Sequence, residues 1–167
     1  MIKFFSNIIL SNRFYAFFGV VGAVFAFAYK WEELYKVGVM LLLVGLIVAV
    51  FELIFLFFKK IPFTGKRNLP NKLSLGDDNT IELVVKNTTK LPWNTKVIDE
   101  LPYQLQERSF SINAFFKPKK LIRLTYTIHP LLRGNYNFGD ILIFTGTPLN
   151  FVKRRVRIPA QMDVPVY

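Results

Sequence analysis

Residues 37–58 read VGVMLLLVGLIVAVFELIFLFF, and this stretch determines how the rest of the chain is organised. It is apolar throughout except for Glu52, and Lys59 and Lys60 follow it directly. The hydrocarbon core of a bilayer is about 30 Å thick, so about 20 apolar residues cross it as a helix. We therefore expect residues 37–58 to span a membrane.

A shorter apolar segment at residues 14–30 precedes this stretch, and Arg13 and Lys30 flank it. Basic side chains at the ends of a short segment can reach the membrane surface, so this segment is also predicted to span. Residues 1–60 then form a two-helix membrane anchor. A cleaved secretory signal is the alternative, because residues 26–28 read Ala-Phe-Ala, the form of a cleavage site. In both cases the domain after Phe58 ends on the same side of the membrane.

Small residues recur in each apolar segment at a spacing of three or four, which places them on one helix face. Membrane helices approach closely through such faces. We therefore expect the two spans to pack through a small-residue face on each. The residues expected there are Ala16, Gly19 and Ala23 in the first segment, and Gly45, Ala49 and Glu52 in the second.

Glu52 is a carboxylate inside an apolar segment, where exposure to lipid costs about 2–4 kcal/mol. Three interpretations remain open from the sequence. The side chain reaches toward Lys59 or Lys60 near the helix end, it contacts another membrane subunit, or it takes part in proton transfer.

The connection between the spans, residues 30–36, contains Trp31 and Tyr35, which suit the membrane interface. The outer flanks carry more basic residues than this connection does. By the positive-inside rule, both termini are cytoplasmic and the connection faces outward.

Residues 61–167 change to the two-residue alternation of β-strands. Residues 121–129 alternate clearly, and Tyr136 and Phe138 alternate with asparagines between two glycines. Short strands at a spacing of about ten residues, separated by turns, indicate an antiparallel sandwich. The predicted fold is thus a helical membrane hairpin followed by an all-β, immunoglobulin-like domain.

Charge is concentrated after Phe58, where 18 Lys and Arg residues stand against 8 Asp and Glu residues. A basic domain beside a membrane is attracted to an anionic leaflet. Nucleic acid is the competing partner, but no nucleic-acid motif accompanies the charge, so we expect none. The chain has no cysteine, which excludes disulfides and thiolate metal sites.

Residues typical of catalysis do not converge in this sequence. The single histidine, His129, ends a predicted strand, Asp77 and Asp78 lie in a predicted turn, and Asp99 and Glu100 have no partner motif. No phosphate loop, nucleotide fingerprint or metal spacing occurs. We therefore expect no enzyme activity, no cofactor, no metal and no small-molecule substrate.

The sharpest basic cluster is the run at residues 153–157, in which Lys153, Arg155 and Arg157 share one strand face. Three interpretations remain open: a charged edge strand in solvent, contact with lipid headgroups, or contact with a partner domain. Lys59 and Lys60 are expected at the headgroups in the second case.

Several motifs in order give the chain a resemblance to a known family. They are Gly76-Asp77, Asn87, Asp99-Glu100-Leu101-Pro102, Arg133-Gly134-x-Tyr136-x-Phe138-Gly139 and Thr147-Pro148-Leu149. The chain resembles the N-terminal half of bacterial proteins of the domain of unknown function 58. These have two membrane helices, an immunoglobulin-like sandwich and a von Willebrand A-like domain, and are often linked to MoxR-type AAA ATPases.

The resemblance implies a membrane-anchored interaction or scaffold module that lies in a bacterial inner membrane and faces the cytoplasm. Its implied partner is a MoxR-type ATPase or another subunit of a membrane complex, with a role in assembly or maturation of envelope complexes. Residues 163–167 look like the linker into the C-terminal domain that the chain lacks. The alternative function is an envelope-facing binding or adhesion domain.

Overall fold

The structure is a computed structural model that describes residues 7–58, 62–107 and 110–167. It divides into two compact units. The first, the helical unit, contains residues 1–60 together with Gly146–Arg154. The second, the β-unit, contains Ile61–Thr145 and Arg155–Tyr167. The division expected at residue 60 therefore needs one correction, because the segment at 146–154 packs in the helical unit.

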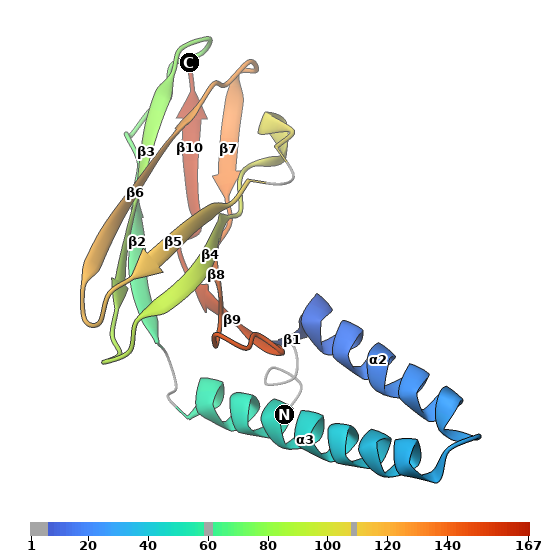
Figure 1. The fold of residues 1–167 in the computed structure, drawn as a ribbon. Coiled ribbons are helices and arrows are strands. Elements are labelled where there is room, and N and C mark those ends of the chain that lie inside the picture. The colour runs from blue at the N-terminus through green and yellow to red at the C-terminus, as the bar shows by residue number, and fades with distance from the viewer. Residues whose placement is uncertain (1–6, 59–61, 108–109) are drawn as a thin grey trace. The chain divides into compact units, whose positions relative to one another are not determined.

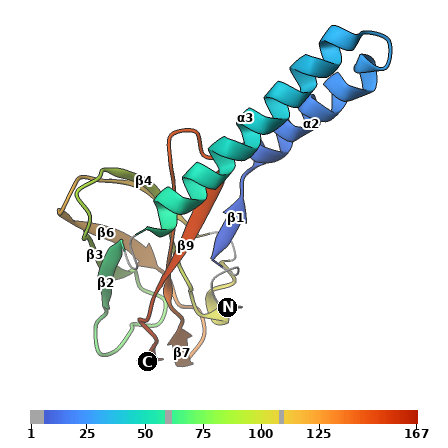
Figure 2. The same cartoon turned by 90° about the horizontal axis from the view of Figure 1, so that it is seen from below.

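The helical unit is an antiparallel pair of helices, α2 (Asn12–Ala28) and α3 (Glu32–Phe57), which run side by side in Figures 1 and 2. The connection expected at residues 30–36 is shorter, because α3 already begins at Glu32. Lys36 explains this early start, since its ammonium pairs with Glu32 at 3.6 Å and Glu33 at 2.9 Å along the first turns.

Helix α3 has 26 residues and is long and apolar enough to cross a bilayer. Helix α2 is also apolar but has 17 residues, at the lower limit of spanning length. The described part of the chain therefore contains one clear candidate span. A short strand, β1 (Ile8–Leu10), precedes α2 and pairs antiparallel with residues 152–154.

The β-unit consists of strands in three sheets, and the pairs with a defined register are antiparallel. One sheet has the order β2-β3-β6, another runs β1-β9-β8-β4-β5, and β10 pairs with β7. The bounds are β2 (Phe63–Asn68), β3 (Asn79–Asn87), β4 (Trp93–Asp99), β5 (Ile112–Phe116), β6 (Leu121–Ile128), β7 (Gly134–Phe138), β8 (Ile141–Gly146), β9 (Val152–Ile158) and β10 (Met162–Val166).

The sheets β2-β3-β6 and β8-β4-β5 pack face to face, as in a β-sandwich. The inward residues Ile81, Leu83 and Val85 of β3 are fully buried, and the rings of Phe63 on β2 and Phe116 on β5 lie 5.3 Å apart. The two-residue alternation produces this arrangement, since it sends every second side chain to one face. The sequence prediction of an antiparallel sandwich is therefore confirmed.

Of two predictions for the β-unit, the one for β7 is confirmed and the one for β10 needs correction. Tyr136 and Phe138 on β7 are buried at 0% and 2% exposure, which confirms the alternation predicted there. The expected linker at residues 163–167 is instead part of β10, where Val164 lies opposite Tyr136. Its inward valines, Val164 and Val166, are buried, and this burial favours a strand over a linker.

Candidate functional site

The helical unit contains a buried carboxylate, Glu52 of α3, which is only 1% exposed. Its Oε2 atom accepts hydrogen bonds from the backbone N–H groups of Phe151 and Val152, each at 2.8 Å. Its Oε1 atom accepts a hydrogen bond from the hydroxyl of Thr147. The carboxylate therefore binds the loop at residues 147–151, which we call the anchor loop.

This arrangement gives Glu52 a partner that the sequence interpretation did not include. The carboxylate contacts a segment of its own chain about 100 residues later. Lys59 and Lys60, the expected partners, lie outside the described residues. A buried carboxylate is stabilised by hydrogen bonds to its charged form, and two backbone N–H groups and a hydroxyl supply them here. No proton-transfer partner stands among these contacts.

The start of α2 holds the other side of the anchor loop. Ser11 precedes α2, and its hydroxyl donates to the backbone carbonyl of Asn150 while its backbone N–H donates to Phe151 at 3.0 Å. Arg13 donates to the carbonyls of Pro148 at 3.2 Å and Leu149 at 3.4 Å. Both helices thus contribute polar groups to one loop, and the hairpin binds the carbonyls of residues 148–151 and the N–H of Phe151.

The ring of Phe151 supplies the apolar part of the contact. It lies 5.3 Å from the ring of Phe17 and 6.2 Å edge-on from the ring of Phe14, both on α2. Aromatic pairs at these distances add to the free energy of burial. The anchor loop is therefore held by hydrogen bonds at its backbone and by ring packing at its end.

Arg154 on β9 is a second buried polar group of the helical unit, at 8% exposure. Its guanidinium donates to the carbonyl of Leu56 at 2.7 Å and lies 4.8 Å from the centre of the Phe57 ring. Carbonyls at the end of a helix lack partners within the helix and carry partial negative charge, so a cation is favourable there. Burial lowers the pKa of Arg154 below its ordinary value.

The sequence analysis singled out the other face of this strand. Lys153, Arg155 and Arg157 alternate with the buried Val152, Arg154, Val156 and Ile158, so the alternation that identified the first set also predicts the second. The expected edge strand needs correction, because β9 lies between β1 and β8. Arg157 pairs with Asp140 at 2.6 Å and with Glu100 at 3.8 Å, within the β-unit.

The helix pair packs through a small-residue face on α3 and through large residues on α2. The ring of Phe17 lies against Gly45, and the ring of Phe25 lies against Gly38. An added Cβ at Gly45 would approach the Phe17 ring closely. Ala49, one turn further along α3, is half-buried.

The expectation of a small-residue face on α2 needs correction. Ala16, Gly19 and Ala23 are exposed in the helical unit, and an added Cβ at Gly19 would meet nothing within 4 Å. Phenylalanine rings of α2 fill the space that the glycines of α3 leave open, so a small face is needed on one helix only.

The most deeply buried carboxylate of the described β-unit is Asp99, at the end of β4. Its Oδ2 atom accepts from Nε of Arg67 at 2.9 Å and from the hydroxyl of Tyr126, and its Oδ1 atom accepts a further guanidinium N–H. The side chains of this ion pair are 1% and 0% exposed. Burial and the Asp99 carboxylate both raise the pKa of Tyr126 above its ordinary value.

Arg67 has further acceptors that complete its hydrogen bonding. It donates to the carbonyls of Ala160 at 2.7 Å and Gly139 at 3.0 Å, and it lies 5.0 Å from the centre of the Phe138 ring. A buried ion pair is tolerated when its remaining hydrogen bonds are satisfied in this way. Sequence reasoning missed Arg67, because its strand was not predicted.

Two motifs of the family resemblance, at residues 99–102 and 133–139, meet at this cluster. Glu100 exchanges backbone hydrogen bonds with Gly139 at 2.8 Å and Asp140 at 3.1 Å, and its side chain accepts from the N–H of Asp140 at 2.9 Å. A Cβ at Gly139 would lie 2.7 Å from the Cβ of Glu100. Glycine is therefore required by the close approach of these two segments.

Groups typical of catalysis remain apart. His129 is exposed and follows β6, and its Nδ1 atom lies 3.2 Å from Oδ1 of Asp78, which precedes the paired strand β3. Within residues 7–58, 62–107 and 110–167, no group of three or more metal-ligating side chains occurs. The buried charged groups Glu52, Asp99 and Arg154 instead bind partners within the chain.

Comparison with known proteins adds little. No protein-family model matches the chain, and no curated protein matches it. The CARDB domain of a Pyrococcus furiosus protein is similar in its solution structure, with 20% identity, a TM-score of 0.47, and coverage of 63% of this chain and 94% of that one. A β-glucosidase from Listeria innocua is similar over 16% of its length, with 16% identity and a TM-score of 0.41. Likenesses with TM-scores below 0.5 carry no argument about function.

Proposed function

We propose that this chain is a membrane-anchored, non-catalytic scaffold whose β-unit presents a binding surface to a protein partner. We further propose that the protein is the N-terminal part of a domain-of-unknown-function-58 type protein in a bacterial inner membrane. In this proposal α2 and α3 both cross the membrane, the sandwich is immunoglobulin-like, and both termini are cytoplasmic.

The observation that carries this proposal is the anchor loop. Glu52 and Arg154 are buried and charged, and each holds backbone groups in place: Glu52 binds two N–H groups of the loop and Arg154 a carbonyl at the end of α3. The end of the candidate span is thereby joined to the first residues of β9 by directional bonds. Within the helical unit, such a junction fixes the first residues of β9, which suits a scaffold, and it engages both charged groups in structural contacts.

The use of acidic residues in the β-unit supports the same proposal. Asp99 pairs with Arg67 and accepts a hydrogen bond from Tyr126, and Asp140 pairs with Arg157. A catalytic carboxylate must reach a substrate, and these carboxylates are enclosed by partners of the same chain. The partner we propose is a MoxR-type AAA ATPase or another subunit of a membrane complex, acting in assembly or maturation of envelope complexes.

The orientation is tested by reporter fusions after Tyr167 in a bacterial host. A fluorescent protein that matures in the cytoplasm should be active there, and a phosphatase that requires the periplasm should be inactive. The opposite result would contradict the cytoplasmic proposal and favour an envelope-facing binding domain. A fusion after Lys30, between the helices, should give the reverse pattern if both helices cross.

The partner is tested by crosslinking in cells followed by purification of the full chain. Recovery of an AAA ATPase would support the proposal, provided that a variant with the anchor loop released by Glu52→Ala recovers less of it. Equal recovery by both chains would show that the junction at Glu52 has no part in partner binding.

A further inference from the structure

One end of the β-unit carries a cluster of exposed lysines interleaved with apolar side chains. It is formed by the loops at residues 88–92 and 117–120 with the adjoining strand ends. We call it the basic end. Its lysines are Lys86, Lys90, Lys117, Lys119 and Lys120, and its exposed apolar residues are Leu91 at 41%, Phe115 at 53% and Leu121 at 50%.

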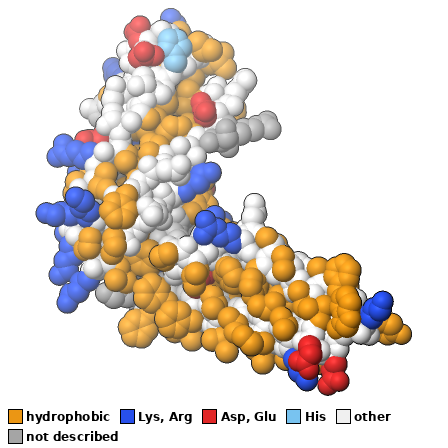
Figure 3. All heavy atoms as spheres, viewed as in Figure 1, with side chains coloured by type: hydrophobic (Ala, Val, Ile, Leu, Met, Phe, Trp, Pro, Cys, Tyr) orange, Lys and Arg blue, Asp and Glu red, His pale blue; other side chains and the backbone are white. Residues whose placement is uncertain are grey.

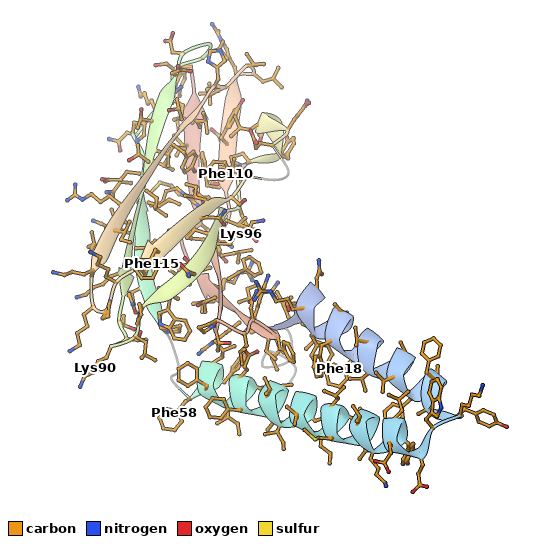
Figure 4. All side chains as sticks on the ribbon, viewed as in Figure 1. Phe18, Phe58, Lys90, Lys96, Phe110 and Phe115 are labelled. Carbon is orange, nitrogen blue, oxygen red and sulfur yellow. The ribbon has the colours of Figure 1, made fainter. Side chains whose placement is uncertain are left out.

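The two loops form one platform held by backbone hydrogen bonds. The N–H of Lys119 donates to the carbonyl of Thr89, and the N–H of Asn87 donates to Lys120, each at 3.0 Å. The buried Asn87 side chain adds bonds to the carbonyls of Leu91 at 2.7 Å and Lys117 at 3.1 Å. The lysines therefore project from a fixed surface, and Figure 4 shows Lys90 pointing away from the sheets.

No carboxylate of the described residues neutralises the charge of the basic end. Residues 86–96 and 110–121 contain no Asp or Glu. Among the described residues, none of the five lysines pairs with a carboxylate. The opposite end of β3 differs, because its turn carries Asp77 and Asp78, and Figure 3 shows acidic side chains there and blue ones over the other end.

The chain enters the β-unit at this same end. The carbonyl of Pro62 accepts from the N–H of Thr88 at 2.9 Å and from its hydroxyl at 3.0 Å, and β2 begins at the next residue, Phe63. Five residues separate Phe63 from Phe57, the last residue of the candidate span α3. A segment of that length reaches at most about 20 Å.

We propose that the basic end docks on the anionic phospholipid headgroups of the leaflet from which α3 emerges. Lysines beside exposed leucine and phenylalanine suit this partner, since their ammonium groups bind phosphates while the apolar side chains enter the interface. The lysines of the basic end differ from the residues expected at headgroups from the sequence, which are Lys59, Lys60, Lys153, Arg155 and Arg157. The proposal rests on the membrane anchoring proposed above.

The test uses the full chain, which has no native cysteine and so accepts a single spin label. Pro118→Cys places the label at the tip of the basic end, and Asp77→Cys places it at the opposite end of β3. The chain is reconstituted in nanodiscs of phosphatidylglycerol or of phosphatidylcholine. The readout is the accessibility of the label to a water-soluble nickel chelate.

We expect the label at position 118 to be shielded in phosphatidylglycerol and accessible in phosphatidylcholine, with position 77 accessible in both. Lys117→Gln with Lys120→Gln should weaken the docking equilibrium about 30-fold, because each lysine near an anionic surface contributes about fivefold. Lys72→Gln with Arg133→Gln changes the net charge equally away from the basic end, and it should leave the shielding intact. Raising the salt concentration should release the wild type.

Equal accessibility of position 118 in the two lipids would overturn the proposal and assign the basic end to an acidic protein partner. Equal loss in both double variants would also overturn it, since the effect would then be one of net charge. Failure of the chain to enter nanodiscs would contradict the anchoring itself. In that case sedimentation of the chain with phosphatidylglycerol vesicles decides: binding lost in Lys117→Gln with Lys120→Gln supports the docking, and absence of binding overturns it.

Discussion

Glu52 of the helical unit and Asp99 of the β-unit are the two most deeply buried carboxylates among the described residues, and they are satisfied in different ways. Asp99 of the β-unit is paired with a guanidinium, whereas the described partners of Glu52 in the helical unit are two backbone N–H groups and a hydroxyl. Removal of Asp99 leaves a buried positive charge. Removal of Glu52 leaves uncharged groups that water can reach once the loop moves away. The first site therefore holds a core together, and the second holds a loop in place.

The largest effect is expected from Asp99→Ala. Breaking a buried ion pair costs about 3–5 kcal/mol because the remaining charge is uncompensated. We expect the free energy of unfolding of the β-unit to fall by that amount. In a Trp31→Phe background, the buried Trp93 of β4 is the sole tryptophan and reports unfolding of the β-unit in denaturant.

Glu82→Ala is the matched control, since Glu82 pairs at 3.4 Å with Arg123, whose side chain is 71% exposed. A surface pair of this kind contributes about 0–1 kcal/mol. If Asp99→Ala and Glu82→Ala lower stability equally, the Arg67 cluster does not stabilise the core.

The next effect is expected from Glu52→Ala. The N–H groups of Phe151 and Val152 lose their acceptor. If the loop stayed in place, each unsatisfied group would cost about 1–3 kcal/mol of stability. We therefore expect the loop to open instead. Trypsin sites at Lys153 and Arg155 follow the loop directly. Their cleavage rate should rise roughly 30-fold or more, because proteolysis follows the population of the open form. Glu33→Ala, which removes an exposed pair, should leave the rate unchanged.

A smaller effect is expected from Gly45→Leu, which alters the helix pair beneath Glu52. The added side chain meets the ring of Phe17, and overpacking of this kind costs about 1–3 kcal/mol. Gly19→Leu is the control, since an added Cβ there meets nothing within 4 Å. The measurement is the thermal stability of the helices in detergent. Equal losses would contradict the one-sided packing described above.

The smallest effect concerns pH. The pKa of Tyr126 is raised in the folded state, so above pH 10 the unfolded chain loses this proton first. The folded state then binds more protons, and stability falls as pH rises. In Tyr126→Phe, the free energy of unfolding should fall less with pH. The difference from the wild type should reach about 1.4 kcal/mol at one pH unit above the ordinary tyrosine pKa. Tyr103→Phe, at an 83% exposed position, should keep the wild-type slope.

The sequence predicts what depends on local pattern. Hydropathy indicates α3, and alternation indicates β3, β6 and the inward Tyr136 and Phe138. Both buried carboxylates escape this kind of reasoning, because their partners lie far along the chain. Asp99 is 32 residues from Arg67, and Glu52 is 95 to 100 residues from its three partners. The composition of α3 shows that Glu52 needs a polar partner, but it does not show which one.

Two signals in the sequence could have identified more of the site. Arg154 occupies the same face as Val152, Val156 and Ile158, so the alternation used for its neighbours predicts its burial. The motif Thr147-Pro148-Leu149 falls in the anchor loop, close to Phe151. The polar Thr147 near the aromatic Phe151 suits a loop that packs on an apolar helix. The position of the loop on the hairpin still depends on contacts that no local pattern reveals.

The most direct test of the account is amide hydrogen exchange in the full chain in detergent. The central claim is that the Glu52 carboxylate holds the N–H groups of Phe151 and Val152. In the wild type, we predict that both amides are protected, and that Glu52→Ala lowers their protection about 30-fold or more while amides of the β3–β6 pair keep theirs. Equal protection of Phe151 and Val152 in the two chains would contradict the claim.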